Sequence, residues 1–162
     1  MRLGLAAALV LGAARAEAQE AGIAVGARAP AVTVTDLEGA PVDLGGYIGR
    51  RPVLLEFWAT WCEVCEALLP AVRAAHDRYG DRVEFFGVNV TVNQSPERVR
   101  KYVAVHRPPF RTLYDGEGAV TRAYEAPTTS FIVIIDRAGK VAYTGVGASQ
   151  DLAAALAAVT AP

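Results

Sequence analysis

Apolar and polar positions change their period along the chain, and these changes mark out strands and helices. Residues 32–35 alternate between apolar and polar, a turn follows at 36–39, and residues 42–44 return, which predicts a small N-terminal hairpin. Continuous apolar runs at 53–57 and 83–90 are typical of strands buried on both faces. Shorter apolar or β-branched segments predict three further strands, at 111–114, 130–135 and 140–144.

Between the strands, apolar residues recur every three or four positions, which is the period of a helix. One such stripe runs from Cys65 to Tyr79. A second helix should begin at Ser95–Pro96–Glu97, where an N-cap serine precedes a first-turn proline and an acidic residue. A brief helix is expected within 115–124 and a last one after 149–151. The order of elements predicts an α/β fold with a central mixed β-sheet flanked by helices.

The N-terminal segment 1–18 has the pattern of a secretory signal peptide. Met1–Arg2 supplies a positive charge, an apolar run follows to about Ala14, and Ala16–Glu17–Ala18 is typical of a cleavage site. This apolar run is shorter than the about 20 residues that a bilayer span takes. We therefore expect no stable membrane insertion once the leader is removed. The sequence therefore predicts export to the periplasm or beyond, where disulfide chemistry is possible.

Length and charge limit the number of domains and the classes of partner that we expect for the mature chain. The chain has 162 residues, 52% of them hydrophobic, which suits one core and a single domain over 19–161. The formal net charge of −1 indicates neither nucleic acid nor an anionic membrane as a partner.

The chain contains two cysteines, Cys62 and Cys65, between a predicted buried strand and a predicted helix. This arrangement puts the first sulfur at the helix N-terminus, where unpaired N–H groups and the helix dipole favour a thiolate. The second sulfur lies one turn further in and is close enough to form a disulfide with the first. A reactive outer thiol beside a shielded resolving thiol is what thiol–disulfide exchange requires.

Two cysteines at this spacing have three other interpretations: chance core residues, half of a zinc site, and an inert structural disulfide. Zinc would need two more Cys or His ligands at short spacing, and the sequence has none. Tryptophan directly before the first cysteine, after an apolar strand, favours a redox pair.

The segment Phe57–Cys65 resembles the active-site segment of thioredoxin-fold proteins, most closely the TlpA/ResA-type periplasmic disulfide reductases. Further segments resemble that family's lead-in hairpin, next core strand and final hairpin, at 25–30, 36–39, 86–90 and 136–141. The resemblance implies a thioredoxin-like fold with an N-terminal β-hairpin and an inserted αβ element.

The same resemblance implies a function. It indicates an exported thiol–disulfide oxidoreductase that reduces protein disulfides, in cytochrome c maturation or redox homeostasis. A membrane-bound electron donor would recycle the pair, no bound cofactor or metal is expected, and the protein should be a monomer.

Glu56 lies six residues before Cys62, on the strand that leads into the site. Thioredoxins have a buried Asp at the matching position. A carboxyl on a strand buried on both faces should have a raised pKa through desolvation, which suits a proton acceptor for Cys65. The alternative is a carboxyl at the strand edge that reaches solvent.

Four further positions around the cysteine pair have expected roles. Trp61 is expected to shield the sulfurs and to offer an apolar docking surface. Glu63 and Val64 form the tip between the cysteines, and the charge of Glu63 should oppose a thiolate, which favours a reducing pair. Leu68 stands where the TlpA type usually has a glutamate, which leaves Glu56 as the acidic partner.

Thioredoxin folds also place a cis-proline opposite the cysteines. Pro127 is the obvious candidate, yet the family spacing, counted six residues from Tyr124 and nine back from Gly139, leads to Ser130. We favour Ser130, with a trans bond, because a non-proline cis bond costs about 2.5–4 kcal/mol. Pro127, Thr129 and Ser130 are therefore the candidates for a loop whose backbone pairs with an extended substrate.

A different class of function uses the same cysteines. A thioredoxin-fold metallochaperone would hold a soft metal such as Cu(I) between Cys62 and Cys65, and the missing proline ring leaves that alternative open. The sequence lacks the Pro-x-x-x-Thr-x-x-Cys arrangement of a peroxiredoxin.

Overall fold

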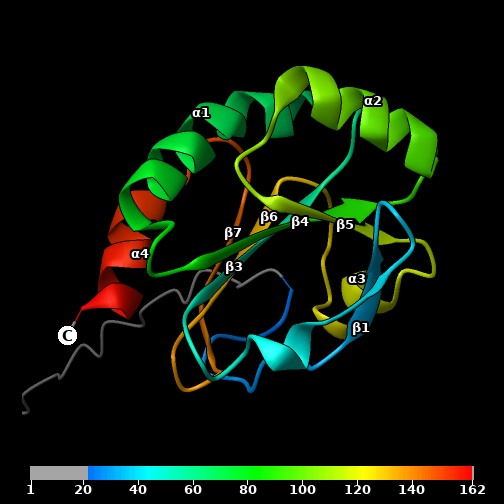
Figure 1. Ribbon diagram of the computed structural model, residues 1–162. Helices are drawn as coiled ribbons and strands as arrows, with labels where there is room; N and C mark the ends of the chain where they lie inside the picture. Colours follow the sequence, from blue (N-terminus) through cyan, green and yellow to red (C-terminus); the bar gives the residue numbers. More distant parts are fainter. Residues whose placement is uncertain (1–21, 162) are drawn as a thin grey trace, which may run out of the picture.

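The computed structural model describes residues 22–161, so the predicted signal peptide lies outside the described residues. A seven-stranded mixed sheet forms the centre of the described chain, in the order β2-β1-β5-β4-β3-β6-β7 (Figure 1). The strands are β1 (Thr33–Asp36), β2 (Pro41–Asp43), β3 (Val53–Trp58), β4 (Glu84–Val90), β5 (Arg111–Asp115), β6 (Phe131–Ile135) and β7 (Val141–Val146). The pairs β3–β4 and β4–β5 are parallel, and the other pairs are antiparallel.

Helices cover both faces of the sheet. One face carries α1 (Glu63–Tyr79), α2 (Pro96–His106) and α4 (Leu152–Thr160), whereas α3 (Ala119–Ala123) and the 3-10 turn η1 (Leu44–Gly46) lie on the other (Figure 1). Within residues 22–161, no helix is long and apolar enough to cross a membrane.

The predicted elements are all present, with ends that differ by a few residues. The N-terminal hairpin is formed by β1 and β2, with Val34 opposite Val42. The helix α2 and the strand β5 stand between the core strand β4 and α3, and they form the predicted αβ insertion. The prediction of a thioredoxin-like α/β fold is confirmed.

The central strand β3 positions the site. All six of its residues are buried, because it is paired with β4 on one side and β6 on the other and covered on both faces. Side chains alternate along it, so that Leu54, Glu56 and Trp58 face the layer of α1 and α2. The residues between them, Val53, Leu55 and Phe57, face η1 and α3.

Candidate active site at Cys62 and Cys65

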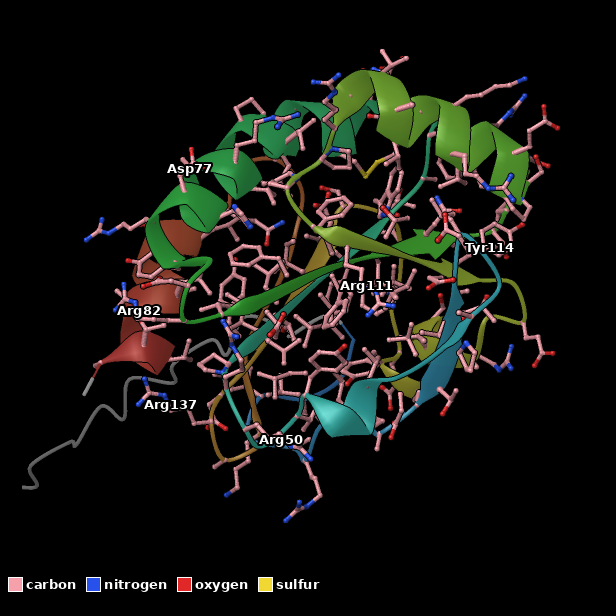
Figure 2. All side chains as sticks on the ribbon, viewed as in Figure 1. Arg50, Asp77, Arg82, Arg111, Tyr114 and Arg137 are labelled. Atoms are coloured by element: carbon pink, nitrogen blue, oxygen red, sulfur yellow. A yellow bond between two sulfur atoms is a disulfide. The ribbon has the colours of Figure 1, made fainter. Side chains whose placement is uncertain are left out.

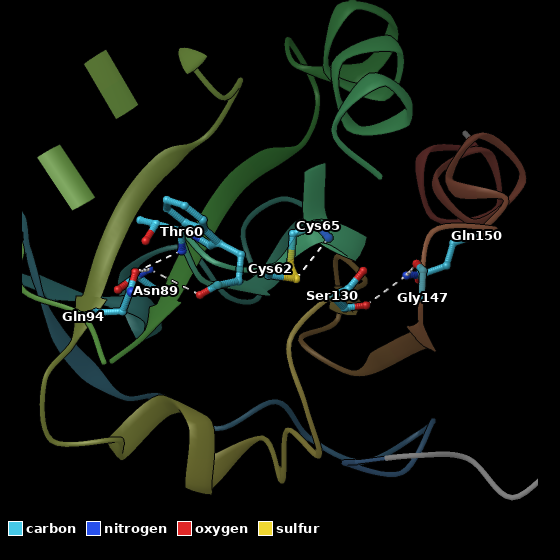
Figure 3. The surroundings of a disulfide bond; sticks show 9 residues. Thr60, Cys62, Cys65, Asn89, Gln94, Ser130, Gly147 and Gln150 are labelled. Atoms are coloured by element: carbon cyan, nitrogen blue, oxygen red, sulfur yellow. Dashed lines mark hydrogen bonds between the residues drawn. A yellow bond between two sulfur atoms is a disulfide. The ribbon is translucent and has the colours of Figure 1, made fainter. Parts of the chain in front are cut away.

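Cys62 is the N-cap residue of α1, directly after the turn that follows β3. Its Sγ accepts a hydrogen bond of 3.0 Å from the backbone N–H of Cys65, in the first turn of the helix, and the same N–H also donates to the carbonyl of Cys62 at 3.1 Å. The two sulfurs are joined in a disulfide, with their Cα atoms 5.2 Å apart (Figure 3). The predicted placement of paired sulfurs at a helix N-terminus is confirmed.

The disulfide lies beside α2, in one buried cluster with Val99 of that helix (Figure 2). Cys62 and Cys65 are each 5% exposed, so a partner can reach the sulfurs only along a restricted path. The side chains of Trp61 and Val64, next to the cysteines in sequence and 48% and 47% exposed, form an apolar rim on the surface. Trp61 is held there because its Nε1–H donates to the carbonyl of Val92 at 2.8 Å. Contact of this rim with a substrate stays a prediction.

Glu56 is buried at the centre of β3, with Gly87 and Ile132 as its register partners on the two neighbouring strands. It faces the same layer as Trp58, which packs in one cluster with both cysteines. Its Oε2 has no hydrogen-bond partner among the described residues. Burial raises the pKa of this carboxyl from 4.5 to about 8. The expected pKa shift and its cause therefore agree with the structure, and the proton-transfer role remains to be tested.

The helix α2 covers the side of the site where Glu56 lies. Tyr102 of α2 packs on Trp58, with 5.3 Å between ring centroids. Burial raises the pKa of the Tyr102 hydroxyl, and the charges of Glu66 and Glu56 raise it further. Leu68 is fully buried in the apolar layer between α1 and the sheet. Its position therefore adds no acidic group, as the sequence indicated.

The loop before β6 contains the two candidates for the position opposite the cysteines. No peptide bond within residues 22–161 is cis. Pro127 is exposed and Thr129 is half-buried, whereas Ser130 is fully buried beside the disulfide (Figure 3). Ser130 has a φ of 60°, and its N–H donates to the carbonyl of Phe57 at 2.8 Å. Proline could match neither feature, since its ring fixes φ near −65° and removes the N–H.

Sequence reasoning missed two glutamines that hold the active-site loops. Gln94 accepts a hydrogen bond of 3.0 Å from the backbone N–H of Thr60, just before Trp61 and Cys62, and one of 3.3 Å from the buried Asn89 (Figure 3). On the other side, Gln150 donates to the carbonyl of Ser130. Asn89 could have been noticed as a polar residue inside an apolar strand, but the glutamines lie in loops without a sequence signal.

A disulfide between Cys62 and Cys65 at a helix start is suited to exchange with the disulfide of a partner, and it offers few ligands for a metal. Within residues 22–161, His, Cys, Asp and Glu side chains form no group of three that could hold a metal ion. The sulfurs of Cys62 and Cys65 would therefore be two ligands without a third from such residues. A thioredoxin-like fold with a Cys-x-x-Cys pair at the start of its first long helix defines a thiol–disulfide oxidoreductase.

Comparison with known proteins agrees with this class. The model of the Redoxin family matches residues 24–159. The chain is 31% identical over 137 residues to the thiol-disulfide oxidoreductase ResA of Geobacillus thermodenitrificans, covering 83% of this chain and 77% of the relative. The chain therefore belongs to the Redoxin family and is a thiol–disulfide oxidoreductase of the ResA type.

Solved structures show the same fold. The thioredoxin domain of the thiol-disulfide oxidoreductase BVU-2223 from Bacteroides vulgatus has a TM-score of 0.73 at 22% identity, covering 85% of this chain and 99% of that one. A secreted Mycobacterium tuberculosis disulfide oxidoreductase, homologous to E. coli DsbE, has a TM-score of 0.66 at 27% identity. It is matched over 78% of this chain and 95% of its own.

Proposed function

We propose that this protein is an exported reductase of protein disulfides. The observation that carries the proposal is that the two cysteines have different surroundings. The Cys62 sulfur accepts a hydrogen bond from the N–H of Cys65 at the helix start, and the carboxyl of Glu56 is buried in the sheet, on the face where the cysteines pack. An N–H donor favours a thiolate on Cys62, and a carboxyl of raised pKa suits proton exchange with Cys65.

The reaction begins with the reduced pair. The Cys62 thiolate attacks one sulfur of a substrate disulfide, the substrate bond breaks, and its second sulfur leaves as a thiolate and takes up a proton. Cys65 then gives its proton to the Glu56 carboxylate and attacks Cys62, which releases the other substrate sulfur as a thiolate. The substrate gains two electrons, and the pair becomes the disulfide seen in the structure.

The pKa of Glu56 makes the second step depend on pH. With a pKa of about 8, the carboxyl is protonated in most molecules at neutral pH, and the fraction able to accept a proton grows as the pH approaches 8. We therefore expect release of the mixed disulfide to become faster over this range. In the reverse direction, the protonated carboxyl is the donor to Cys65.

The charges near Cys62 support the reducing direction. Glu63 and Glu66 lie in the first turn of α1, and both side chains are exposed. Negative charge near Cys62 opposes the thiolate, and a pair whose reduced form is less stabilised is a weaker oxidant.

Export and partners complete the proposal. The signal-like segment 1–18 and the secreted relative from Mycobacterium tuberculosis support a periplasmic or extracellular location. Substrates would be disulfides of proteins, including apocytochrome c cysteines before haem attachment or the dithiol of a copper site. A membrane-bound dithiol donor would return two electrons to the Cys62–Cys65 disulfide.

The reduction potential of the Cys62–Cys65 pair tests the direction. We expect equilibration with glutathione or thioredoxin to give a value on the reducing side, together with reduction of insulin. A value near about −120 mV, where the strong oxidant DsbA lies, would refute the reductase assignment. Stoichiometric binding of Cu(I) without insulin reduction would indicate the metallochaperone instead.

The role of Glu56 is tested separately by single-turnover kinetics. We expect Glu56→Gln to slow release of the mixed disulfide and to leave the first attack by Cys62 nearly unchanged. Glu117→Gln, which removes an exposed carboxyl between β5 and α3, is the matched control and should leave both steps unchanged. An unchanged release rate in Glu56→Gln would remove Glu56 from the mechanism.

A further inference from the structure

The hydroxyl of Ser130 has no role in the steps above, and its surroundings are unusual. The residue is fully buried, and its Oγ has no hydrogen-bond partner among residues 22–161. Its φ of 60° lies in the left-handed region, which a serine occupies at a cost in free energy. A buried hydroxyl without a partner is a further cost, so the fold holds this group in place against two penalties.

Hydrogen bonds to the backbone of Ser130 fix the place of this residue in the loop. Its N–H donates to the carbonyl of Phe57 at 2.8 Å, and its carbonyl accepts from the N–H of Gly147 at 3.0 Å and from Nε2 of Gln150 at 3.3 Å. Gln150 is itself held, because it donates to the carbonyl of Gly147 at 2.7 Å and accepts from the hydroxyl of Tyr143 at 3.1 Å. Ser130 therefore stays beside the disulfide, and its hydroxyl is buried without a bond to either sulfur of the oxidised pair (Figure 3).

Reduction changes what the neighbouring sulfurs can accept. A sulfur atom is a weak acceptor when it carries no charge, whereas hydrogen bonds to charged acceptors are about twice as strong as neutral ones. When two electrons enter the disulfide, the S–S bond breaks, Cys65 takes up a proton, and Cys62 is left as the thiolate. A strong acceptor then forms near the residue that carries the unpartnered hydroxyl (Figure 3).

We propose that Ser130 is a catalytic residue whose hydroxyl donates a hydrogen bond to the Cys62 thiolate of the reduced protein. With the N–H of Cys65, the thiolate then has two donors, one from the helix and one from the loop. A proline in this place has no O–H or N–H to donate. The inference rests on the redox role of the pair, and it holds whichever direction the pair works in.

Two substitutions separate the hydroxyl from the backbone. Ser130→Ala removes the hydroxyl and keeps the unfavourable φ, whereas Ser130→Gly removes the hydroxyl and relieves it. We expect both variants to lower the equilibrium constant for reduction by glutathione by about tenfold, which corresponds to about 30 mV. Alkylation of the reduced proteins by iodoacetamide at neutral pH should slow several-fold. Thr128→Ala, an exposed position in the same loop, is the control and should match the wild type.

Several outcomes would overturn the role of Ser130. Potentials equal to that of the wild type in both variants would show that the hydroxyl makes no such bond. A shift in only one of the two would assign the effect to the backbone. If Ser130→Ala does not fold, Ser130→Gly against the wild type decides, because glycine tolerates the observed φ. The absolute potential of the wild type tests the proposed direction, so the two proposals fail separately.

Discussion

The buried carboxyl of Glu56 makes a thermodynamic prediction that needs no assay of activity. The side chain is 2% exposed, and its pKa is raised from 4.5 to about 8 by burial. Between these values the folded protein holds a proton that the unfolded chain has released. The free energy of unfolding must then fall as the pH rises, by about 1.4 kcal/mol per pH unit from this group. The sum over the interval is on the order of 5 kcal/mol, a large part of the stability of a typical domain.

Glu56→Gln removes this titration and keeps the shape of the side chain. The wild type should lose stability relative to Glu56→Gln as the pH rises from 4.5 to about 8, and the difference should level off outside this interval. Urea unfolding of both oxidised proteins across the pH range measures it, because all other titrating groups cancel in the difference. Glu63→Gln controls for the loss of a surface carboxyl. Parallel stability curves for wild type and Glu56→Gln would refute the argument from burial.

Three further substitutions test other parts of the site. Cys65→Ser should trap a mixed disulfide with an insulin chain, visible on a non-reducing gel, and no adduct would mean that the outer sulfur is not the attacking one. Gln94→Ala removes the acceptor of the Thr60 N–H and should lower the free energy of unfolding by about 1 kcal/mol and slow insulin reduction. Unchanged values would show that the loop holds its shape without Gln94. Gly87→Ala would place a Cβ 2.1 Å from a ring carbon of Phe110, so we expect a loss of about 1–3 kcal/mol in urea unfolding. Wild-type stability would mean that the ring moves aside freely.

Sequence alone was sufficient where one local pattern determines the structure. The apolar run at 53–57 indicated a strand covered on both faces, and the structure places Glu56 of this strand on the face of the cysteines. The short turn after this strand then leaves Cys62 no other place than the start of α1. The redox pair and the cause of the Glu56 pKa shift could be predicted from this one segment, whereas the fold was predicted from the order of elements along the chain.

The loop at Ser130 was harder because distant residues determine its conformation. Its hydrogen-bond partners, Phe57, Gly147 and Gln150, lie far away in sequence, and counting positions could only choose between Ser130 and Pro127. The left-handed φ and the orphaned hydroxyl have no sequence signal, since serine rarely takes this conformation.

Strand β3 connects the groups to which the proposed reaction assigns a role. It carries Glu56, its end leads into Cys62, and the carbonyl of Phe57 holds Ser130. These groups can therefore drift apart only if the middle of the molecule opens, and heat inactivation should coincide with global melting. Exposed positions such as Val64 do not hold these groups together. Substitutions in the rim can therefore change which partners bind while the residues of the proposed reaction stay the same.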